Sequence, residues 1–269
     1  MNKISLPILI ALIIASNCFA NICGGSSGCS AAKSDKEETK SKRSEKKPKS
    51  KLDEVLQKLK KQNRQLKTYQ ADIKYIFTDA FDIKSTRTGK IYYKKTDEAS
   101  MLKIRFDTYQ LDDGDKEKRR EEYYFDGIWL KKVDYLNQTI NSYQKAEKDK
   151  PVNAFEMISR DFPIIGFTKK DDLRKNFDIK LLPNKEDKDI IELKLEVKKD
   201  SVYSDKYKEI DFMIDKKRFL PARLITESTE GDTYDIRLFD SKINKKIKDG
   251  VFKLETPDNF KENIHPLNK

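Results

Sequence analysis

Apolar and polar residues alternate along the C-terminal third of the chain. In the run from Ile191 to Lys198, aliphatic side chains alternate strictly with charged ones. A pleated strand sends alternate side chains to opposite faces, so one face of this strand is apolar and the other is hydrated. The same period of two returns in later runs up to Asn259, and turn residues such as Glu230-Gly231-Asp232 separate the runs. The pattern predicts an antiparallel meander with one solvated face.

Similar alternation predicts strands in the first half of the chain. Apolar side chains recur at every second position around Ile73, Ile91 and Ile104, and residues 109–120 form a polar stretch that we expect to be a loop. Asp126-Gly127 lies between two apolar runs and is a strong hairpin signal, because glycine accepts the positive φ of a tight turn. Together the runs predict eleven or twelve strands and a mainly β fold.

Helical periods interrupt the strands and make the expected class α+β. An amphipathic helix is predicted near the N-terminus by apolar residues at i, i+3, i+4 and i+7: Leu52, Val55, Leu56 and Leu59. A short helical insertion is predicted between Pro151 and Phe167, with Pro163 ending it. A further short helix is expected near Asp171, and the sheet resumes at Phe177.

The N-terminal fifty residues have the composition of a leader and a linker. One basic residue, a short apolar core and Cys18-Phe19-Ala20 predict a secretory signal peptide over residues 1–20. Residues 21–51 are rich in Lys, Ser and Glu and predict a disordered linker. The folded domain then spans residues 52–269, and export places it outside the cytoplasm.

All three cysteines lie in this N-terminal region. The folded domain therefore has no means of forming a disulfide or a thiolate metal site. Cys18 follows the apolar core directly and Cys29 follows Ser26-Ser27-Gly28, so each is a candidate for lipid attachment. Whether the protein is soluble or lipid-anchored stays open.

The residue types needed for common catalytic sites are missing. The one histidine, His265, lies near the C-terminus on what we expect to be a mobile tail, so a His-based triad or multi-histidine metal site is excluded. The carboxylates of Glu121-Glu122 are expected to point to opposite faces of a strand. We therefore expect neither an enzyme nor a cofactor. The net charge of +11 resides largely in the linker and in alternating strand positions, which favours a solvated surface over nucleic-acid binding.

Aromatic and aliphatic side chains share one face of the predicted sheet. Two interpretations stay open, a filled core and a cavity for an apolar ligand. The candidate lining residues are Ile73, Tyr75, Phe77, Ile91, Tyr93, Leu102, Ile104, Phe106, Trp129, Phe155, Ile158, Leu193, Leu195, Phe212, Leu224, Ile236 and Leu238.

Several motifs follow one another in an order typical of a known family. The amphipathic helix precedes Tyr69-Gln70-Ala71-Asp72-Ile73, then come Gly89-Lys90-Ile91-Tyr92-Tyr93 and Asp126-Gly127-Ile128-Trp129-Leu130, and the chain closes with Leu220-Pro221-Ala222-Arg223 and Asp249-Gly250. Over residues 52–260 this order resembles the outer-membrane lipoprotein carrier family, LolA and its relatives.

The resemblance implies an incomplete antiparallel β-barrel of about eleven strands, covered by the N-terminal helix and the helical insertion. It implies an apolar inside that holds acyl chains of lipoproteins crossing the periplasm, with an inner-membrane donor and an outer-membrane acceptor as partners, and we expect a monomer. The family's carriers typically have an Arg near the end of the second strand that latches the lid. This chain has Lys94-Lys95-Thr96 there, and Lys95 supplies charge without the planar fork of Arg.

Three functions are therefore compared. The first is a periplasmic carrier of lipoproteins. The second is a membrane-tethered lipid-binding or envelope-sensing module of the same fold, modified at Cys18 or Cys29. The third is a structural β domain with a filled core that binds a protein partner through its edge.

Overall fold

The computed structural model describes residues 50–97, 99–154, 170–183, 187–255 and 257–267. The expected signal peptide with Cys18, most of the linker with Cys29, and most of the helical insertion lie outside these residues. The described helices and strands are α2 Lys51–Gln65, β1 Thr68–Thr78, β2 Lys84–Lys95, β3 Ser100–Leu111, β4 Glu117–Phe125, β5 Trp129–Asp134, β6 Thr139–Gln144, α4 Lys170–Asn176, β7 Phe177–Leu182, β8 Ile190–Val197, β9 Tyr207–Asp215, β10 Leu220–Ser228, β11 Thr233–Ile243, the 3₁₀ turn η1 Asp249–Phe252 and β12 Lys261–His265.

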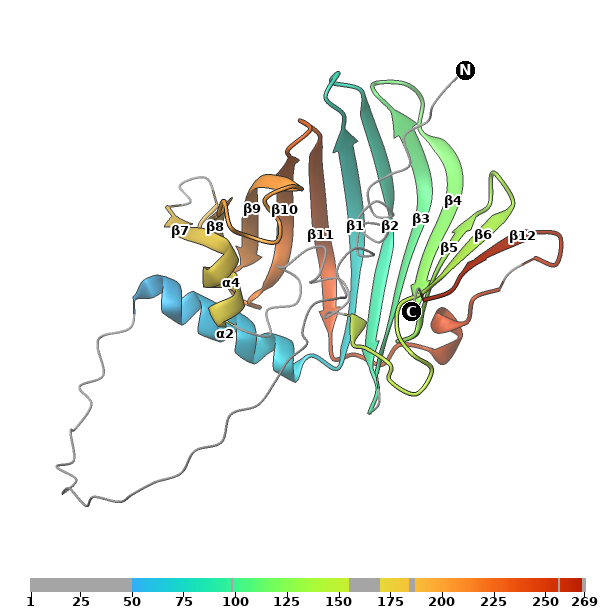
Figure 1. Cartoon of the computed structure of the whole chain (residues 1–269), viewed down its shortest axis with the longest axis horizontal. Helices are drawn as coiled ribbons and strands as arrows, with labels where there is room; N and C mark the ends of the chain where they lie inside the picture. The colour runs from blue at the N-terminus through green and yellow to red at the C-terminus, as the bar shows by residue number, and fades with distance from the viewer. Residues whose placement is uncertain (1–49, 98, 155–169, 184–186, 256, 268–269) are drawn as a thin grey trace, which may run out of the picture.

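Twelve described strands form one sheet in the order β12-β6-β5-β4-β3-β2-β1-β11-β10-β9-β8-β7 (Figure 1). Strands β1 to β6 form one meander and β7 to β11 another, and the antiparallel pair of β1 with β11 joins them. β12 adds to the edge in parallel with β6. The edges at β12 and β7 do not meet, so the sheet is open. The expected incomplete barrel is confirmed, with eleven antiparallel strands and a parallel twelfth.

Helix α2 follows from its capping residues and its apolar stripe. The backbone N–H of Asp53 donates to Ser50 Oγ at 3.1 Å, which caps the helix start. Leu56 and Leu59 are buried against the sheet, as their spacing predicts. α2 packs on β10 and α4 packs on β7, and Figure 1 shows both helices toward the β7–β10 side of the sheet.

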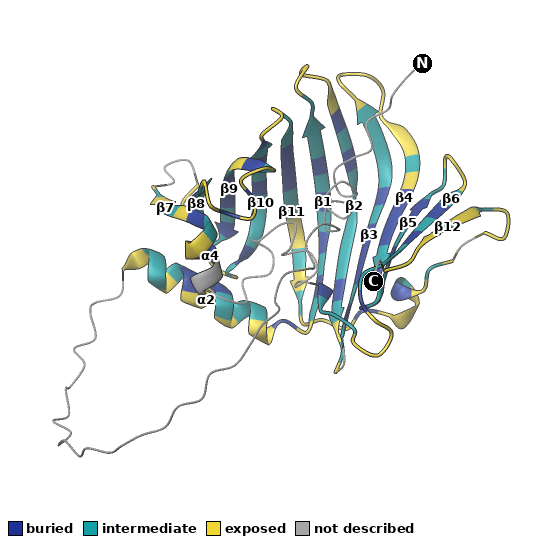
Figure 2. Ribbon diagram, in the orientation of Figure 1, coloured by how far each residue is buried: buried dark blue, intermediate teal, exposed yellow. Residues whose placement is uncertain are grey.

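The sheet has an inner face and an outer face. We call inner the face whose side chains join Leu56 and Leu59 of α2 in one hydrophobic cluster. In Figure 2 buried stretches alternate with less buried ones along the central strands. The alternation noted in the sequence is the source of this division, because neighbouring residues of a strand point to opposite faces.

The C-terminal segment crosses the outer face. Lys94 on this face pairs with Asp249 of η1 at 2.7 Å, and the Lys103 ammonium donates to the Lys253 carbonyl at 3.4 Å. The segment then enters β12, where His265 stacks on Tyr143 with 4.5 Å between ring centroids. The prediction of a mobile tail at His265 is therefore wrong, since pairing with β6 supplies partners that lie far away in sequence.

Two local predictions can be compared directly with the turns. Gly127 has φ +102°, and Asp126 Oδ1 accepts from the Trp129 backbone N–H at 2.7 Å, which confirms the hairpin between β4 and β5. The polar loop expected over residues 109–120 is shorter, because β3 continues to Leu111 and β4 begins at Glu117. Pairing between β3 and β4 thus draws polar residues of the expected loop into the sheet. Local composition does not reveal this stabilisation by a neighbouring strand.

Candidate lipid-binding face

Cross-strand register aligns apolar side chains into rows across the inner face. One row runs from β7 to β1 through Leu181, Leu193, Phe212, Leu224, Ile236 and Tyr75. A second row runs from β1 to β6 through Tyr69, Tyr93, Leu102, Phe125, Leu130 and Tyr143. The inner face is therefore apolar across all eleven antiparallel strands.

Most of the residues predicted to line a cavity lie on this face. The described ones that join the inner cluster are Ile73, Tyr75, Phe77, Ile91, Tyr93, Leu102, Ile104, Phe106, Leu193, Leu195, Phe212, Leu224, Ile236 and Leu238. Phe155 and Ile158 lie outside the described residues. The structure therefore brings the predicted set together on one surface.

Trp129 departs from the prediction. Leu130 pairs with Phe125, a member of the inner cluster, so Trp129 one position earlier points to the outer face. Residues 126–128 form the turn between β4 and β5. Because of this turn, the odd-numbered residues of β4 and the even-numbered residues of β5 point to the inner face. An aromatic residue beside a turn cannot be assigned to a face until the turn length is known.

Five polar and aromatic residues form a buried cluster on the inner face, which we call the inner charged cluster: Tyr75, Arg87, Glu121, Tyr123 and Lys132. The Arg87 Nε lies 3.5 Å from Glu121 Oε2, and the Lys132 Nζ lies 3.0 Å from Glu121 Oε1. The Tyr123 hydroxyl also donates to Glu121. The Arg87 guanidinium lies over the Tyr75 ring, 5.9 Å from its centroid. Charged side chains are thus embedded in a mainly apolar surface.

Burial keeps the two phenols of this cluster protonated. Desolvation raises the pKa of Tyr75 well above its usual value. Desolvation also raises the pKa of Tyr123, and the charge of Glu121 and its hydrogen bond act in the same direction. Both hydroxyls therefore remain donors across the physiological pH range.

A similar charged group lies directly behind, on the outer face. Glu122 is fully buried, with Oε2 3.1 Å from Lys103 Nζ and Oε1 2.7 Å from Arg120 Nη2. Glu121 and Glu122 therefore point to opposite faces, as the strand period predicts. Each carboxylate is held by its own pair of cations.

The inner charged cluster was missed at the sequence level. Its signal is the presence of Arg87 at an inward position of β2, two residues before Gly89, and of Glu121 two residues before Tyr123. A charged residue in phase with an apolar set departs from the usual pattern of a half-buried strand. The cluster could therefore have been found in the sequence from these charged residues at inward positions.

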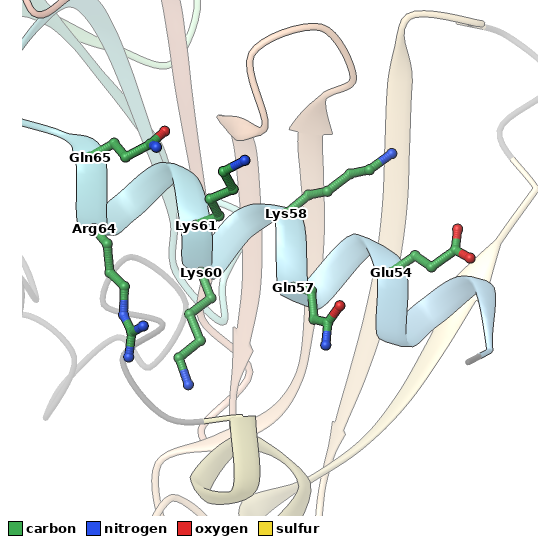
Figure 3. A pocket seen from close by; sticks show the side chains of 7 residues that line it. All are labelled: Glu54, Gln57, Lys58, Lys60, Lys61, Arg64 and Gln65. Carbon is green, nitrogen blue, oxygen red and sulfur yellow. The ribbon is translucent and has the colours of Figure 1, made fainter. Parts of the chain in front are cut away.

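A pocket lies apart from this face, on α2. It has a volume of about 530 Å³ and is lined by Glu54, Gln57, Lys58, Lys60, Lys61, Arg64 and Gln65 (Figure 3). These side chains lie along the helix away from the buried Leu56 and Leu59, and four of them are cations. The four cations make the pocket attractive to anionic groups.

The predicted latch residue lies near the same helix. Lys95 is exposed at the end of β2, and its backbone N–H donates to the Lys67 carbonyl at 2.7 Å. The neighbouring Lys94 pairs with Asp249 instead of a lid element. A latch at Lys95 stays a prediction.

Helices of the described segments are all too short or too polar to cross a bilayer. Within the same segments, His, Cys, Asp and Glu side chains form no group of three suited to a metal ion.

The fold and the apolar face together define a class of protein. Its members have an open, mainly antiparallel sheet with an apolar inner face, and helices pack on one side of that face. No protein-family model matches the chain, and a search of curated proteins gave no match. Solved structures of similar shape do exist, and they are distant.

An uncharacterized conserved protein from Thermus thermophilus is 11% identical, with a TM-score of 0.48, and the match covers 80% of this chain and all of that one. MucB in the Pseudomonas aeruginosa MucA/MucB complex is 14% identical, with a TM-score of 0.44, over 75% of this chain and 60% of that one. A LolA superfamily protein from Nitrosomonas europaea is 12% identical, with a TM-score of 0.30, over 75% of this chain and 96% of that one. The last of these structures carries the name of the superfamily that the motif order resembles.

Proposed function

We propose that this protein is an exported carrier that holds acyl chains of lipoproteins against its inner face and moves them through the periplasm towards the outer membrane. The observation that carries the proposal is the continuous apolar inner face, built from two rows that cross the sheet. Among the described residues, α2 and α4 lie on the β7–β10 side of that face. The inner face of β1 to β6 is the surface we assign to acyl chains.

The dimensions of the face suit a lipid. Neighbouring strands are about 4.8 Å apart, so a row of six strands is about 24 Å long. One leaflet of a bilayer is about 15 Å deep, so a single row is long enough for an acyl chain lying along it. Each methylene removed from water contributes about 0.8 kcal/mol, and the total is enough to hold a chain but still allows release to an acceptor.

A tethered lipid-binding or envelope-sensing module is the second candidate. The cationic side chains on the outside of α2 favour it, because a basic surface is attracted to anionic lipid headgroups. The basic linker that precedes α2 would keep this surface close to a membrane if Cys18 or Cys29 is lipidated. Labelling with a fatty acid in the wild type and in the Cys18→Ser and Cys29→Ser variants tests the anchor, and an unlabelled wild type excludes it.

Mass spectrometry of the natively purified full-length protein tests the carrier. We expect acyl chains or a lipoprotein to co-purify with the wild type. Ile91 and Tyr92 are half-buried neighbours on opposite faces of β2, so they provide a matched pair. Ile91→Asp should lose the bound lipid because it places a charge on the inner face, whereas Tyr92→Asp should retain it.

A wild type that carries no lipid and takes up no added apolar dye would indicate a filled core, and the protein would then be a structural β domain. Circular dichroism of both variants shows that a loss of lipid is not a loss of fold.

A further inference from the structure

Among the buried side chains of the inner face that the structure describes, two cations share one carboxylate. Arg87 and Lys132 are cations, and Glu121 is the carboxylate that lies between them. Burying a charge is costly, and two cations that share a single carboxylate retain the capacity to bind a further anion.

Two other carboxylates lie near the cluster, and they make hydrogen bonds to neutral groups and no ion pair with its cations. Asp134 lies opposite Glu121 in register, but its Oδ1 accepts from the backbone N–H groups of Leu136 and Asn137 at 3.0 and 3.1 Å. Asp232 accepts from the Ala80 backbone N–H and the Tyr234 hydroxyl, both at 3.1 Å. Neither carboxylate makes an ion pair with Arg87 or Lys132 in the described structure.

A neutral donor in the same cluster is unsatisfied. The Tyr75 hydroxyl has no hydrogen-bond partner among the described residues, although the side chain is only 3% exposed. Tyr75 lies directly opposite Arg87 in the register of β1 with β2. A buried hydroxyl without a partner costs free energy, and a ligand oxygen would remove that cost.

Arg87 also retains donors for a ligand. Its Nε faces Glu121, and its Nη1 donates to Ser85 Oγ at 3.3 Å. A guanidinium has five N–H donors in a planar fork, so these two contacts leave others available for a phosphate or carboxylate.

We propose that the inner charged cluster binds the anionic group, a phosphate or a carboxylate, at the head of an amphiphile whose acyl chain lies on the apolar rows. The inference rests on the proposed lipid-binding function and specifies its ligand. Tyr75 belongs both to a row and to the cluster, so a single amphiphile can contact both. The protein then prefers anionic amphiphiles to neutral ones of equal chain length.

Titration calorimetry on the full-length protein tests this preference with three probes. Dodecyl phosphate carries both groups, dodecanol carries the chain alone, and inorganic phosphate carries the anion alone. We expect the wild type to bind dodecyl phosphate at least about tenfold more tightly than dodecanol, the effect of about one charged hydrogen bond. Inorganic phosphate should bind weakly, since it lacks the apolar contribution.

Two variants of the cluster give opposite expected changes. Lys132→Met removes a cation at similar length and should weaken dodecyl phosphate binding about tenfold with little effect on dodecanol. Glu121→Gln removes the competing carboxylate and should strengthen dodecyl phosphate binding. Lys103→Met is the matched control, because Lys103 makes a comparable buried pair with Glu122 on the outer face, and its binding should equal that of the wild type.

Equal affinity of the wild type for dodecyl phosphate and dodecanol would overturn the inference, and this comparison needs no variant to fold. Folded Lys132→Met and Glu121→Gln proteins with unchanged selectivity would overturn it as well. In both cases dodecanol binding would leave the proposed function standing. Absence of binding to either amphiphile would reject the proposed function itself, and tight binding of inorganic phosphate would indicate a site for the free anion.

Discussion

Single side chains on the outer face show how the sheet accommodates its high charge. Asp235 is buried and accepts from Arg223 Nη2 and Arg237 Nη2, each at 2.7 Å. Burial by itself would raise the pKa of Asp235, but the hydrogen bonds and charges of the two arginines outweigh it and lower that pKa below the usual 3.8. The ionised form is therefore favoured by the fold.

Asp235→Asn tests this group through the pH dependence of stability. Because the folded pKa is depressed, the contribution of Asp235 is present above the unfolded value of 3.8 and is lost as the pH falls through the folded pKa. At neutral pH we expect the variant to be less stable by about 1–3 kcal/mol. The loss should shrink below about pH 4.

Urea unfolding between neutral and acidic pH measures the effect. Asp178→Asn is the control, since its carboxylate is mostly exposed and should contribute little. A difference between the Asp235→Asn variant and the wild type that is independent of pH would contradict the assignment.

The strands β7 and β8 show how the position of a strand in the sheet determines how far a substitution lowers the free energy of unfolding. Leu193 of β8 and Leu181 of β7 are paired across the strands and point to the same inner face. Leu193 is completely buried, whereas Leu181 on the edge strand is 36% exposed. A leucine therefore contributes a different amount to the free energy of unfolding in each of these adjacent strands.

Leu193→Ala and Leu181→Ala form a matched pair. We expect Leu193→Ala to lower the free energy of unfolding by about 2–5 kcal/mol, because it leaves a cavity in the packed interior. Leu181→Ala should cost less than about 1 kcal/mol, since water already reaches its side chain. Chemical denaturation measures both, and equal losses would show that the β7 edge is covered.

At the scale of the whole molecule, the sheet depends on a junction between strands that are distant in sequence. β1 pairs with β2 on one side and β11 on the other, and it thereby joins the two meanders. The edge strands β7 and β12 each have a sheet neighbour on one side. Backbone hydrogen bonds at the centre should open with the largest free energy.

Amide hydrogen exchange followed by mass spectrometry tests this order. Protection should be greatest in β1 and β11 and should fall towards β7 and β12. An edge strand can open by breaking its pairing with one neighbour, whereas a central strand must lose its pairing with two. The exposed turn at residues 216–218, between β9 and β10, is an internal reference for weakly protected amides. Uniform protection from β12 to β7 would mean that the sheet opens only as a whole.

The sequence by itself predicted eleven or twelve strands, the meanders, α2 and most of the inner face, because these follow from local periods of two and of about 3.6 residues. It assigned fourteen of the seventeen candidate lining residues to the inner face, as the structure has them; Trp129 was placed on the wrong face, and Phe155 and Ile158 fall outside the described residues. Only the tertiary structure decided the pairing of β12 with β6 and the meeting of Arg87, Glu121 and Lys132. These contacts join residues from different strands, and their register depends on turn lengths and bulges that local patterns do not specify.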